Sequence, residues 1–367
     1  MPDTFRVAVI GRTGRGDYGH AIDTVWAEVP ATKVVAVADD DRMGLAAAAK
    51  RLGVDRTYAD YRQMLDEVKP DIVAIAPRWV DQHRDMTVAA AERGIHIFME
   101  KPFCRSPAES DEIIAACERT HTRLAIAHQT RYSPKIDVVR DMIAAGRIGK
   151  ILELRGRGKE DQRGGGEDLF VLGSHIMNLI CTFGGAPQWC FGTVAVDGRP
   201  AQPADVKEGP EGLGPLAGNS VSATYGMPDG VTAYFNSVRG GGQSSRFGLL
   251  ICGSAGLIEI QTGYVPNVKY LDDPNWSPGR SGRAWQDIST AGLGQPEPLA
   301  DGSALAGNKV AVLDLIDAIR ENREPKCSAY DARSTIEMIM AVFASHVEQG
   351  PVAMPLANRQ NALAAWK

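Results

Sequence analysis

The sequence predicts an α/β domain with a doubly wound parallel sheet, followed by an α+β domain with an open, mostly antiparallel sheet. Three observations lead to this prediction. Short apolar runs alternate with helical patterns over the first 125 residues, a glycine-rich turn follows the first of these runs, and strand patterns joined by loops dominate afterwards. We therefore expect one domain over residues 1–125 and a second over residues 126–367.

Five short apolar runs without polar alternation predict the strands of the first domain. Strands of this kind are covered on both faces, as in a parallel sheet with right-handed crossovers. The predicted strands are Val7–Ile10, Val34–Ala38, Ile72–Ala76, Ile95–Met99 and Leu124–Ala127. The helices expected between them are Ala21–Ala27, Met43–Leu52, Tyr61–Glu67, Arg84–Arg93 and Ala108–Arg119.

Partly alternating strand patterns predict the antiparallel sheet of the second domain. These strands are Ile151–Gly158, Phe191–Val196, Ser220–Tyr225, Val231–Ser237, Phe247–Cys252, Gly256–Gln261 and Val268–Leu271. A single helix, Val171–Phe183, interrupts the series, and two long Pro/Gly-rich stretches, Arg199–Gly218 and Asp272–Gly302, are expected to be surface loops. The other expected helices are Lys135–Ala145, Lys309–Ile319 and Ala332–Glu348, the last of them free to pack back on the first domain.

Composition excludes several classes of protein. A balance of 40 basic against 45 acidic residues leaves a charge of −5, which provides no attraction for nucleic acid. No apolar run reaches the roughly 18 residues of a membrane helix, and a strand pattern begins at Phe5, so we expect neither a membrane span nor a secretory leader. Six scattered cysteines without a CxxC, and no HxxxH, predict free thiols, no metal site and a cytoplasmic protein.

The turn after the first strand has the glycine spacing of a dinucleotide-binding loop. Gly11 ends the strand, and the pattern Gly14-x-Gly16-x-x-Gly19 follows, which makes the turn longer than usual and leaves its register open. Glycines let the backbone approach a pyrophosphate, and the N-terminus of a following helix offers free N–H groups and a positive dipole. The candidate cofactor contacts of this turn are Gly11, Thr13, Gly14, Gly16, Tyr18 and Gly19.

An acidic group follows the second strand, about 20 residues after the turn. Asp39 is the best candidate to accept hydrogen bonds from the adenosine ribose hydroxyls, and an acid there repels a 2′-phosphate, which favours NAD over NADP. Asp40 is a second cofactor candidate, although Asp40 and Asp41 also fit a solvated cap of the next helix. Arg42 is the residue that would suit a 2′-phosphate, so NADP stays the less favoured cofactor.

Three further segments complete a family pattern. The fourth strand ends in Glu100-Lys101-Pro102, and His128-Gln129-Thr130-Arg131-Tyr132-Ser133-Pro134 and Gly173-Ser174-His175-Ile176-Met177-Asn178 come later. In this order, and together with the glycine-rich turn, they resemble the Gfo/Idh/MocA oxidoreductases, the family of glucose–fructose oxidoreductase and inositol dehydrogenase. The resemblance covers nearly the whole chain. It implies a Rossmann domain, an open antiparallel sheet, and a sugar or cyclitol held between them over the nicotinamide.

The resemblance also implies roles for single residues of the first domain. Lys101 matches the family lysine and stands at the carboxyl end of a parallel strand, where it would polarise or protonate a substrate oxygen, or accept its proton. Glu100 would orient Lys101 or bind near the ribose. Pro77 and Trp79 lie where the family places a segment against the cofactor, and Trp79 would stack on it or simply pack.

The second domain departs from the family pattern around the expected catalytic histidine, His175. The dehydrogenases of the family have an Asp four residues before this histidine and another three after it, whereas this chain has Val171 and Asn178. On one helix these three residues would share a face, so Asn178 would orient the imidazole without charge while Val171 would not. Glu167 or Asp168 would then supply the missing carboxylate, or instead cap the helix or contact sugar hydroxyls.

A basic stripe precedes this helix. Arg155, Arg157 and Lys159 alternate along a strand and therefore point to one face of the sheet. Facing the substrate, the stripe would favour an anionic or heavily hydroxylated ligand; facing outward, it would be an ordinary polar face. The candidate substrate contacts, from position or from the resemblance, are Lys101, Arg131, Tyr132, Lys159, Arg163, Asp168, His175 and Asn178.

Three functions fit these residues. The first is an NAD-dependent oxidoreductase acting on a ring hydroxyl of a sugar, glycoside or cyclitol, with Lys101 and His175 handling the proton. The second is a redox-neutral glycosidase that uses tightly held NAD for transient oxidation at C3, elimination, addition of water and re-reduction, with an acidic glycoside as a candidate substrate. The third is a non-catalytic NAD-binding regulator, suggested by Val171. The resemblance also implies a homodimer or homotetramer formed through the second domain's sheet.

Overall fold

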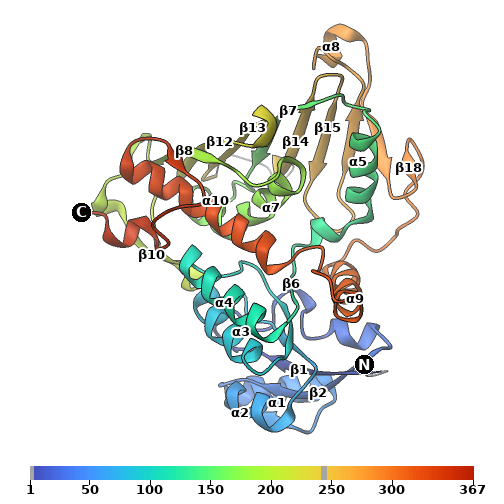
Figure 1. Cartoon of the computed structure of the whole chain (residues 1–367), viewed down its shortest axis with the longest axis vertical. Helices are drawn as coiled ribbons and strands as arrows, with labels where there is room; N and C mark the ends of the chain where they lie inside the picture. Colours follow the sequence, from blue (N-terminus) through green and yellow to red (C-terminus); the bar gives the residue numbers. More distant parts are fainter. Residues whose placement is uncertain (1–3, 241–245) are drawn as a thin grey trace. The chain divides into compact units, whose positions relative to one another are not determined.

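The computed structural model describes residues 4–240 and 246–367 of the chain (Figure 1). It divides into two compact units. The first unit holds Met1–Gln129, Pro210–Leu213 and Ser303–Arg333, and the second holds Thr130–Gly209, Gly214–Gly302 and Ser334–Lys367. The N-terminal unit therefore contains a segment from near the end of the chain, including all of helix α9 (Ala304–Glu321).

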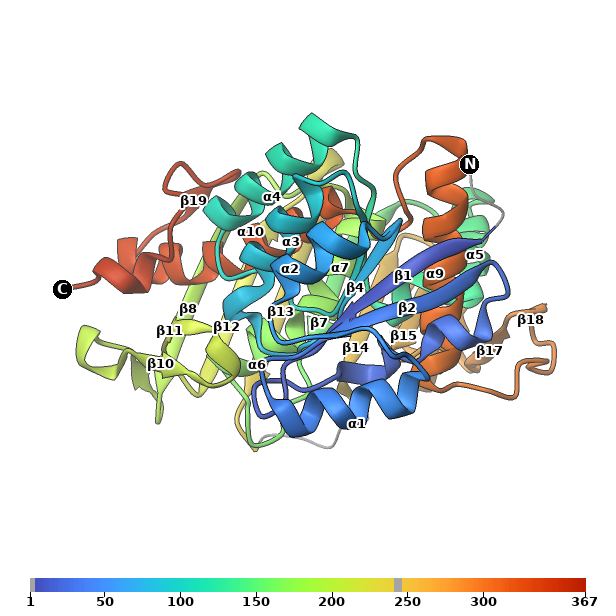
Figure 2. The same cartoon turned by 90° about the horizontal axis from the view of Figure 1, so that it is seen from below.

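The first unit is built on a parallel six-stranded sheet with the order β3-β2-β1-β4-β5-β6, which confirms the doubly wound α/β prediction. Figure 2 shows β2, β1 and β4 side by side in this sheet. The strands are β1 (Phe5–Ile10), β2 (Thr32–Ala38), β3 (Thr57–Tyr58), β4 (Ile72–Ile75), β5 (His96–Met99) and β6 (Leu124–Ile126). Besides α9, its helices are α1 (Arg42–Leu52), α2 (Tyr61–Val68), α3 (His83–Ala91) and α4 (Pro107–Thr120).

Apolar packing and side-chain caps explain these elements. Residues 7–10 of β1 and 72–75 of β4 are all buried, as expected for strands covered on both faces. Asp41 caps α1 by accepting a hydrogen bond from the Gly44 N–H at 2.7 Å, which is the capping role left open for it. Ser106 caps α4 at 3.3 Å, one residue before Pro107.

The predicted helix over Ala21–Ala27 is wrong. Two short 3₁₀ turns, η1 (Gly19–Ala21) and η2 (Val25–Glu28), replace it. The chain turns through left-handed conformations, with φ of 40° at His20 and 63° at Ala21, which an α-helix does not allow. Asn308 of α9 holds this conformation from outside by donating from Nδ2 to the His20 carbonyl at 2.7 Å. No pattern within a short stretch of sequence predicts a contact between residues 288 positions apart.

The second unit is built on a large, mostly antiparallel sheet, as predicted; only β7 and β13 pair in parallel. Its order is β18-β17-β16-β15-β14-β7-β13-β12-β8-β19, with β9 pairing β8. The strands are β7 (Ile151–Arg157), β8 (Trp189–Val196), β9 (Arg199–Pro200), β12 (Ser220–Gly226), β13 (Thr232–Val238), β14 (Gly248–Gly253), β15 (Leu257–Gln261), β16 (Val268–Leu271), β17 (Gln286–Ser289), β18 (Gly292–Leu293) and β19 (Val352–Ala353).

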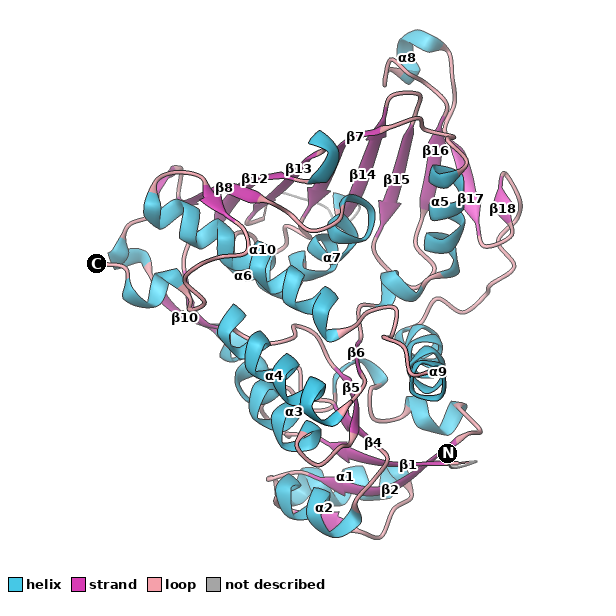
Figure 3. Ribbon diagram, in the orientation of Figure 1, coloured by secondary structure: helices cyan, strands magenta, loops and turns pink. Residues whose placement is uncertain are grey.

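Helices cover one face of this sheet (Figure 3). They are α5 (Pro134–Ala144), α7 (Gly173–Gly184) and α10 (Ala329–Glu348), which begins in the first unit. Glycines in two of the strands allow the helices to pack closely against the sheet. A Cβ on Gly156 of β7 would overlap Ile176 of α7, and a Cβ on Gly192 of β8 would overlap Val342 of α10. The even-numbered residues of these strands therefore face the helices.

Two other predictions for the second unit need correction. The single helix over Val171–Phe183 is two helices, α6 (Gly166–Val171) and α7, because the chain breaks at Leu172 with φ −111° and ψ −38°. The two stretches expected to be loops contain short elements. The first has β9 and the hairpin β10 (Lys207–Gly209) and β11 (Gly214–Leu216); the second has α8 (Pro278–Ser281), β17 and β18.

All six cysteines are free thiols, and five of them are buried. Burial raises the pKa of the Cys117 and Cys190 thiols to about 12, so both are protonated near neutral pH. Within residues 4–240 and 246–367, no helix has the length and apolarity needed to cross a membrane.

Candidate dinucleotide and catalytic site

The carboxyl ends of the parallel strands bring the predicted site segments of the first unit to one edge of its sheet. The glycine-rich turn follows β1, Asp39 follows β2, Pro77–Trp79 follows β4, Glu100–Lys101 follows β5 and His128 follows β6. Open α/β sheets bind their ligands at this edge. The segments are spread over 118 residues of sequence, from Gly11 to His128, and only the sheet order makes them neighbours.

Two glycines let the turn pack closely against this edge. Gly16 has φ 93°, and a Cβ there would overlap the backbone nitrogens of Arg78 and Trp79. Its carbonyl accepts a hydrogen bond from the Arg78 N–H at 3.1 Å. A Cβ on Gly19 would come within 2.6 Å of the Glu100 carboxylate. These glycines therefore serve contacts between the turn, the Pro77–Trp79 segment and Glu100, besides any approach to a phosphate.

The turn uses much of its own backbone hydrogen-bonding capacity. The N–H groups of Arg15 and Asp17 both donate to the Arg12 carbonyl, at 3.0 and 2.9 Å, and the Gly14 N–H donates to the Asp17 carboxylate at 2.8 Å. No α-helix follows the turn, so the expected helix dipole is absent from residues 19–28. Gly14 faces open space, since a Cβ there would meet no atom within 4 Å. At Gly14 the turn therefore has no packed neighbour, although its N–H is already used by Asp17.

Asp39 is buried and belongs to the turn. Its carboxylate accepts from the Thr13 N–H at 3.1 and 3.2 Å, from the Thr13 hydroxyl at 2.7 Å, from the Tyr18 hydroxyl at 2.9 Å and from the Asp41 N–H at 3.0 Å. A carboxylate has about four acceptor positions, so these donors fill it. Burial, followed by the charge of Asp39, raises the pKa of Tyr18 and keeps that hydroxyl a donor. The predicted contact of Asp39 with a ribose would have to compete with these hydrogen bonds.

Asp40 is the acid that remains open, with a side chain that is 66% exposed. It lines a cavity of about 150 Å³ at the ends of β1 and β2, together with Ile10, Gly11, Arg12, Ala38, Asp39, Ala59, Asp60, Tyr61, Gln82 and Met86. Apolar walls with a polar rim suit an adenosine.

Arg12 stands in this cavity and was missed by the sequence analysis. Its guanidinium is buried, donates to Asp81 at 2.8 Å and lies 3.8 Å from the Asp40 carboxylate. Among the described residues, its Nε–H has no hydrogen-bond partner. A buried donor without a hydrogen bond, next to an exposed carboxylate, offers the donor and the acceptor that a ribose hydroxyl needs, because a hydroxyl both accepts and donates. The signal available in the sequence was its position directly after Gly11.

Lys101 and Glu100 form a buried charged pair of neighbours at the end of β5. Lys101 is 7% exposed, and its backbone N–H donates to the Glu100 carboxylate at 2.7 Å. The His20 imidazole contacts the other oxygen of this carboxylate. Burial works to raise the pKa of Glu100, but the His20 hydrogen bond and the charge of Lys101 outweigh it and lower that pKa. Glu100 is thus an ionised partner for the lysine, which agrees with the orienting role expected for it.

His128 was quoted in a motif but was given no role. Burial, followed by the charge of Lys101, lowers its pKa to about 3. The imidazole is therefore neutral near neutral pH and offers one N–H and one lone pair beside the lysine.

His175 and Asn178 lie three residues apart on α7 in the second unit, so they share a face. The His175 ring meets Phe247 edge-on, with centroids 6.3 Å apart. Val171 ends α6, on the other side of the break at Leu172. The expectation that Val171, His175 and Asn178 lie on one continuous helix is therefore wrong.

Asp168 is fully buried and anchors the connection between β7 and α6. It accepts from the Ser237 hydroxyl at 2.5 Å, from the Glu160 N–H at 3.1 Å and from the Lys159 N–H at 3.3 Å. Burial raises its pKa, and the Ser237 hydrogen bond opposes that shift. Its donors come from the backbone and a hydroxyl of the same unit, which makes Asp168 an organiser of this loop.

Lys159 and Arg163 share one partner, Asp161. The Lys159 ammonium lies 3.5 Å from its carboxylate, and the Arg163 guanidinium donates to it at 2.6 Å. The hydrogen bond from Arg163 lowers the pKa of Asp161 to about 2. Both predicted substrate contacts thus have a counter-ion inside the loop.

The basic stripe lies on the sheet face opposite α7. Gly156 faces α7, so Arg155 and Arg157 on either side of it point the other way. Arg155 is paired with Glu153 at 2.6 Å and Arg157 with Glu160 at 2.9 Å. Of the two orientations left open, the structure has the stripe away from the helix that carries His175.

Arg131 and Tyr132 belong to the turn η4 (Gln129–Tyr132) that precedes α5. Tyr132 is buried among the largest core side chains, whereas Arg131 is partly exposed. The Thr130 hydroxyl accepts from the Gly263 N–H at 2.9 Å and ties this turn to the end of β15. Of the two, Arg131 remains the residue with an accessible side chain.

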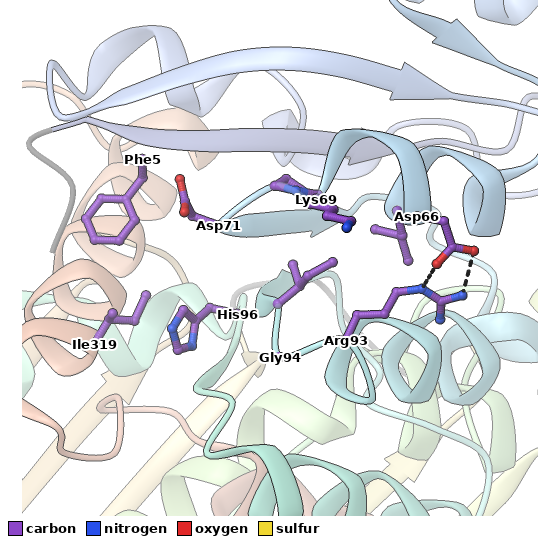
Figure 4. A pocket seen from close by; sticks show the side chains of 11 residues that line it. Phe5, Asp66, Lys69, Asp71, Arg93, Gly94, His96 and Ile319 are labelled. Atoms are coloured by element: carbon purple, nitrogen blue, oxygen red, sulfur yellow. Dashed lines mark hydrogen bonds and ion pairs between the residues drawn. The ribbon is translucent and has the colours of Figure 1, made fainter.

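A larger cavity of about 640 Å³ lies at the opposite edge of the first unit's sheet (Figure 4). It opens at the amino ends of β1, β4 and β5, where Phe5, Asp71 and His96 stand. Figure 4 shows Arg93 at its rim bound to Asp66 through two hydrogen bonds, of 2.7 and 3.0 Å. It shares no residue with the glycine-rich turn or with Lys101 and is not part of the candidate site.

The parallel sheet, the glycine-rich turn after β1 and the acids after β2 define a dinucleotide-binding Rossmann domain. Residues 5–128 match the model of a family described as "Oxidoreductase family, NAD-binding Rossmann fold". Residues 5–128 are therefore similar to the NAD-binding domain of the Gfo/Idh/MocA oxidoreductases, a family whose cofactor is of the NAD type. The cavity lined by Arg12 and Asp40 lies at the carboxyl ends of β1 and β2, where the glycine-rich turn begins.

Two curated relatives match the chain over short segments. Levoglucosan dehydrogenase of Pseudarthrobacter phenanthrenivorans is 31% identical over 163 residues, which is 41% of each chain. Glycosyl hydrolase family 109 protein 1 of Akkermansia muciniphila is 33% identical over 115 residues, 29% of this chain and 24% of that protein. The matched segment spans less than half the length of either relative.

The fold extends further than the sequence similarity. A solved structure titled levoglucosan dehydrogenase, complex with NADH and L-sorbose, superposes with a TM-score of 0.77. The superposition covers 96% of this chain and 100% of the other at 19% sequence identity. Both units therefore have the fold of that protein.

Proposed function

We propose that this chain is an NAD-dependent oxidoreductase that oxidises a ring hydroxyl of a sugar, a glycoside or a cyclitol. The observation that carries the proposal is the nearly complete burial of Lys101 at the carboxyl edge of the parallel sheet, beside an ionised Glu100. A lysine held in this way polarises a hydroxyl or takes its proton as the C–H bond breaks. When bound, NAD supplies the acceptor of the hydride.

His128 and His175 support Lys101 in this proposal. A neutral His128 beside Lys101 exchanges hydrogen bonds without adding a second positive charge. His175 is the second candidate base, and Asn178 on the same helix face is its candidate orienting group. Val171 stands where the resemblance places an Asp for His175, so we propose that the proton transfer depends most on Lys101.

One assay with two signals tests this function. The protein is incubated with NAD and a panel of sugars, cyclitols and chromogenic glycosides, some of them acidic, while NADH absorbance and released aglycone are followed together. Net formation of NADH without aglycone is the expected result. NADH binding without any turnover across the panel would contradict the proposal and favour a regulatory protein.

The similarity to a protein named glycosyl hydrolase family 109 protein 1 favours a second candidate function. In a redox-neutral glycoside cleavage, oxidation at C3 acidifies the C2 proton, the C1 substituent leaves, water adds and the carbonyl is reduced again. The same assay separates the two functions. Aglycone release that requires NAD but accumulates no NADH would replace the dehydrogenase proposal with this one.

We also propose that the second unit pairs with a second copy of the chain through the sheet face opposite α7. Trp189 and Phe191 of β8 are 40% and 45% exposed on that face. Phe191→Asp would place a charge on it and is expected to convert a dimer or tetramer into a monomer in light scattering after gel filtration. Met43→Asp, at a 78% exposed apolar residue of the first unit, is the matched control. An unchanged mass for Phe191→Asp would disprove this interface.

A further inference from the structure

His83 is completely buried at the start of α3, between two backbone carbonyls. Its Nδ1 lies 2.8 Å from the Pro102 oxygen, and its Nε2 lies 2.8 Å from the Pro77 oxygen. Pro77 follows β4, and Pro102 follows β5 and Lys101. Because β4 and β5 are neighbours in the sheet, the ring spans the carboxyl ends of two adjacent strands.

Both partners of this ring are acceptors. A carbonyl oxygen only accepts hydrogen bonds, whereas a neutral imidazole has a single N–H. A neutral ring would therefore direct one lone pair at a carbonyl oxygen within the protein interior, where an unmade hydrogen bond is costly. With both nitrogens protonated, the ring donates two charge-assisted hydrogen bonds. Two contributions oppose a positive charge on this ring: the desolvation of a completely buried cation and the dipole at the start of α3. The two charge-assisted hydrogen bonds act against both.

The two carbonyls belong to the two sides of the candidate site. The Pro77 carbonyl belongs to the segment whose Arg78 N–H donates to Gly16 of the glycine-rich turn, at 3.1 Å. The Pro102 carbonyl comes directly after Lys101. Joining these carbonyls fixes the distance between the cofactor-binding turn and the lysine within the first unit.

We propose that His83 is a positioning residue that clamps the Pro77–Trp79 segment to the Lys101–Pro102 turn through two donated hydrogen bonds. The clamp holds the Lys101 ammonium in place relative to the cofactor-binding turn. The effect of the clamp on catalysis rests on the proposed function of Lys101. The existence of the two hydrogen bonds does not depend on that function. Each turn is also held by its own strand, so loss of the clamp loosens the geometry of the site more than the fold.

The protonation of the ring is tested first, by NMR of the ¹⁵N-histidine-labelled protein at neutral pH. We expect two protonated ring nitrogens for His83, assigned by their loss in His83→Gln. His96 provides an internal reference for a neutral ring, because its Nδ1 accepts from the Arg123 N–H at 3.0 Å and burial lowers its pKa to about 4. A His83 ring with a single proton would overturn the clamp.

The functional consequence is tested with two matched variants. Glutamine at position 83 can donate to one of the carbonyls but does not span both. We expect His83→Gln to raise the Kd for NADH about tenfold and to lower kcat about tenfold with the substrate found in the panel. His96→Gln, at the opposite edge of the same sheet, is expected to change neither by more than about twofold. A folded His83→Gln protein with unchanged Kd and kcat would overturn the positioning role.

The two proposals fail in distinguishable ways. If no compound in the panel is turned over, the proposed function fails, while the NMR spectrum and the NADH titration still decide the clamp. If Lys101 proves essential for turnover but His83 carries a single proton, the function stands and the clamp fails. Should His83→Gln not fold, the ring nitrogens of His83 are assigned through its backbone resonances, and the spectrum of the unaltered protein decides.

Discussion

The glycine-rich turn of the first unit and the glycine-rich connection between β7 and α6 in the second are built alike but differ in what they leave open. Each is anchored by a buried aspartate, Asp39 or Asp168, whose carboxylate is filled by nearby backbone N–H groups and hydroxyls. In the connection, the exposed charges pair with one another through Asp161. In the turn, Arg12 keeps a free buried N–H among the described residues and Asp40 is exposed. Glycines and charges in a loop therefore do not identify a ligand site; an open cavity with an unmet donor does.

Substitutions of one lysine in each unit test this difference between the two loops. They are expected to produce the largest change in kcat. Lys101→Met removes the buried ammonium and is expected to lower kcat by about 10²–10⁴-fold, the range of general acid–base catalysis, while NADH still binds. Lys159→Met removes an ammonium already paired with Asp161 and is expected to change kcat/KM less than about threefold. Steady-state kinetics and an NADH titration measure both. A comparable loss in Lys159→Met would place that lysine on the substrate.

The two buried aspartates provide the next comparison. Asp39→Asn and Asp168→Asn each direct an amide N–H₂ at groups that now donate, and each is expected to lower the free energy of unfolding by about 2–4 kcal/mol. Urea unfolding monitored by circular dichroism measures this loss. Only Asp39→Asn should also weaken NADH binding, because it disorders the turn beside the Arg12–Asp40 cavity. Equal NADH affinities in the two variants would separate Asp39 from the cofactor site.

Cofactor preference tests the exposed acid of the turn. Asp40→Ser removes the carboxylate that opposes a 2′-phosphate next to Arg12, and we expect the ratio of kcat/KM for NADP to that for NAD to rise about tenfold. Melting temperature should change little, since this side chain is 66% exposed. A ratio that stays constant in Asp40→Ser but rises in Asp39→Ser would return the ribose contact to Asp39.

The smallest effect concerns Asp161, whose pKa is lowered to about 2, chiefly by the hydrogen bond from Arg163. An unfolded Asp has a pKa of about 3.9, so the folded state favours the ionised form. This stabilisation is fully present above about pH 4 and disappears as pH falls through 2. The difference in unfolding free energy between the unaltered protein and Asp161→Asn should shrink over that interval. A difference independent of pH would show that the ion pairs of this loop do not stabilise it.

Much of the fold was predictable because its signals are local. The apolar runs of β1, β4 and β5 and the helical periodicity of α1, α2 and α4 appear within short windows, and the structure confirms them with boundaries shifted by one or two residues. The helix predicted over residues 21–27 is wrong because the conformation there is not set by local signals. Its conformation depends on Asn308, 288 residues away from His20, and no window of sequence contains both.

The features of the candidate site also fall into those that local sequence predicts and those that depend on distant contacts. Local sequence patterns were enough to predict that Lys101 ends a parallel strand and that glycines and acids follow the first two strands, since strand, turn and order are local properties that place these residues at one edge. Which acid is exposed, and which residues span the strand ends, depends on contacts between distant parts of the chain. The bonds that fill Asp39, pair Arg12 with Asp81 and fix His83 to Pro77 and Pro102 join residues 26, 69, 6 and 19 positions apart. Whether a donor is already satisfied depends on such long-range partners, and a list of residue types does not contain them.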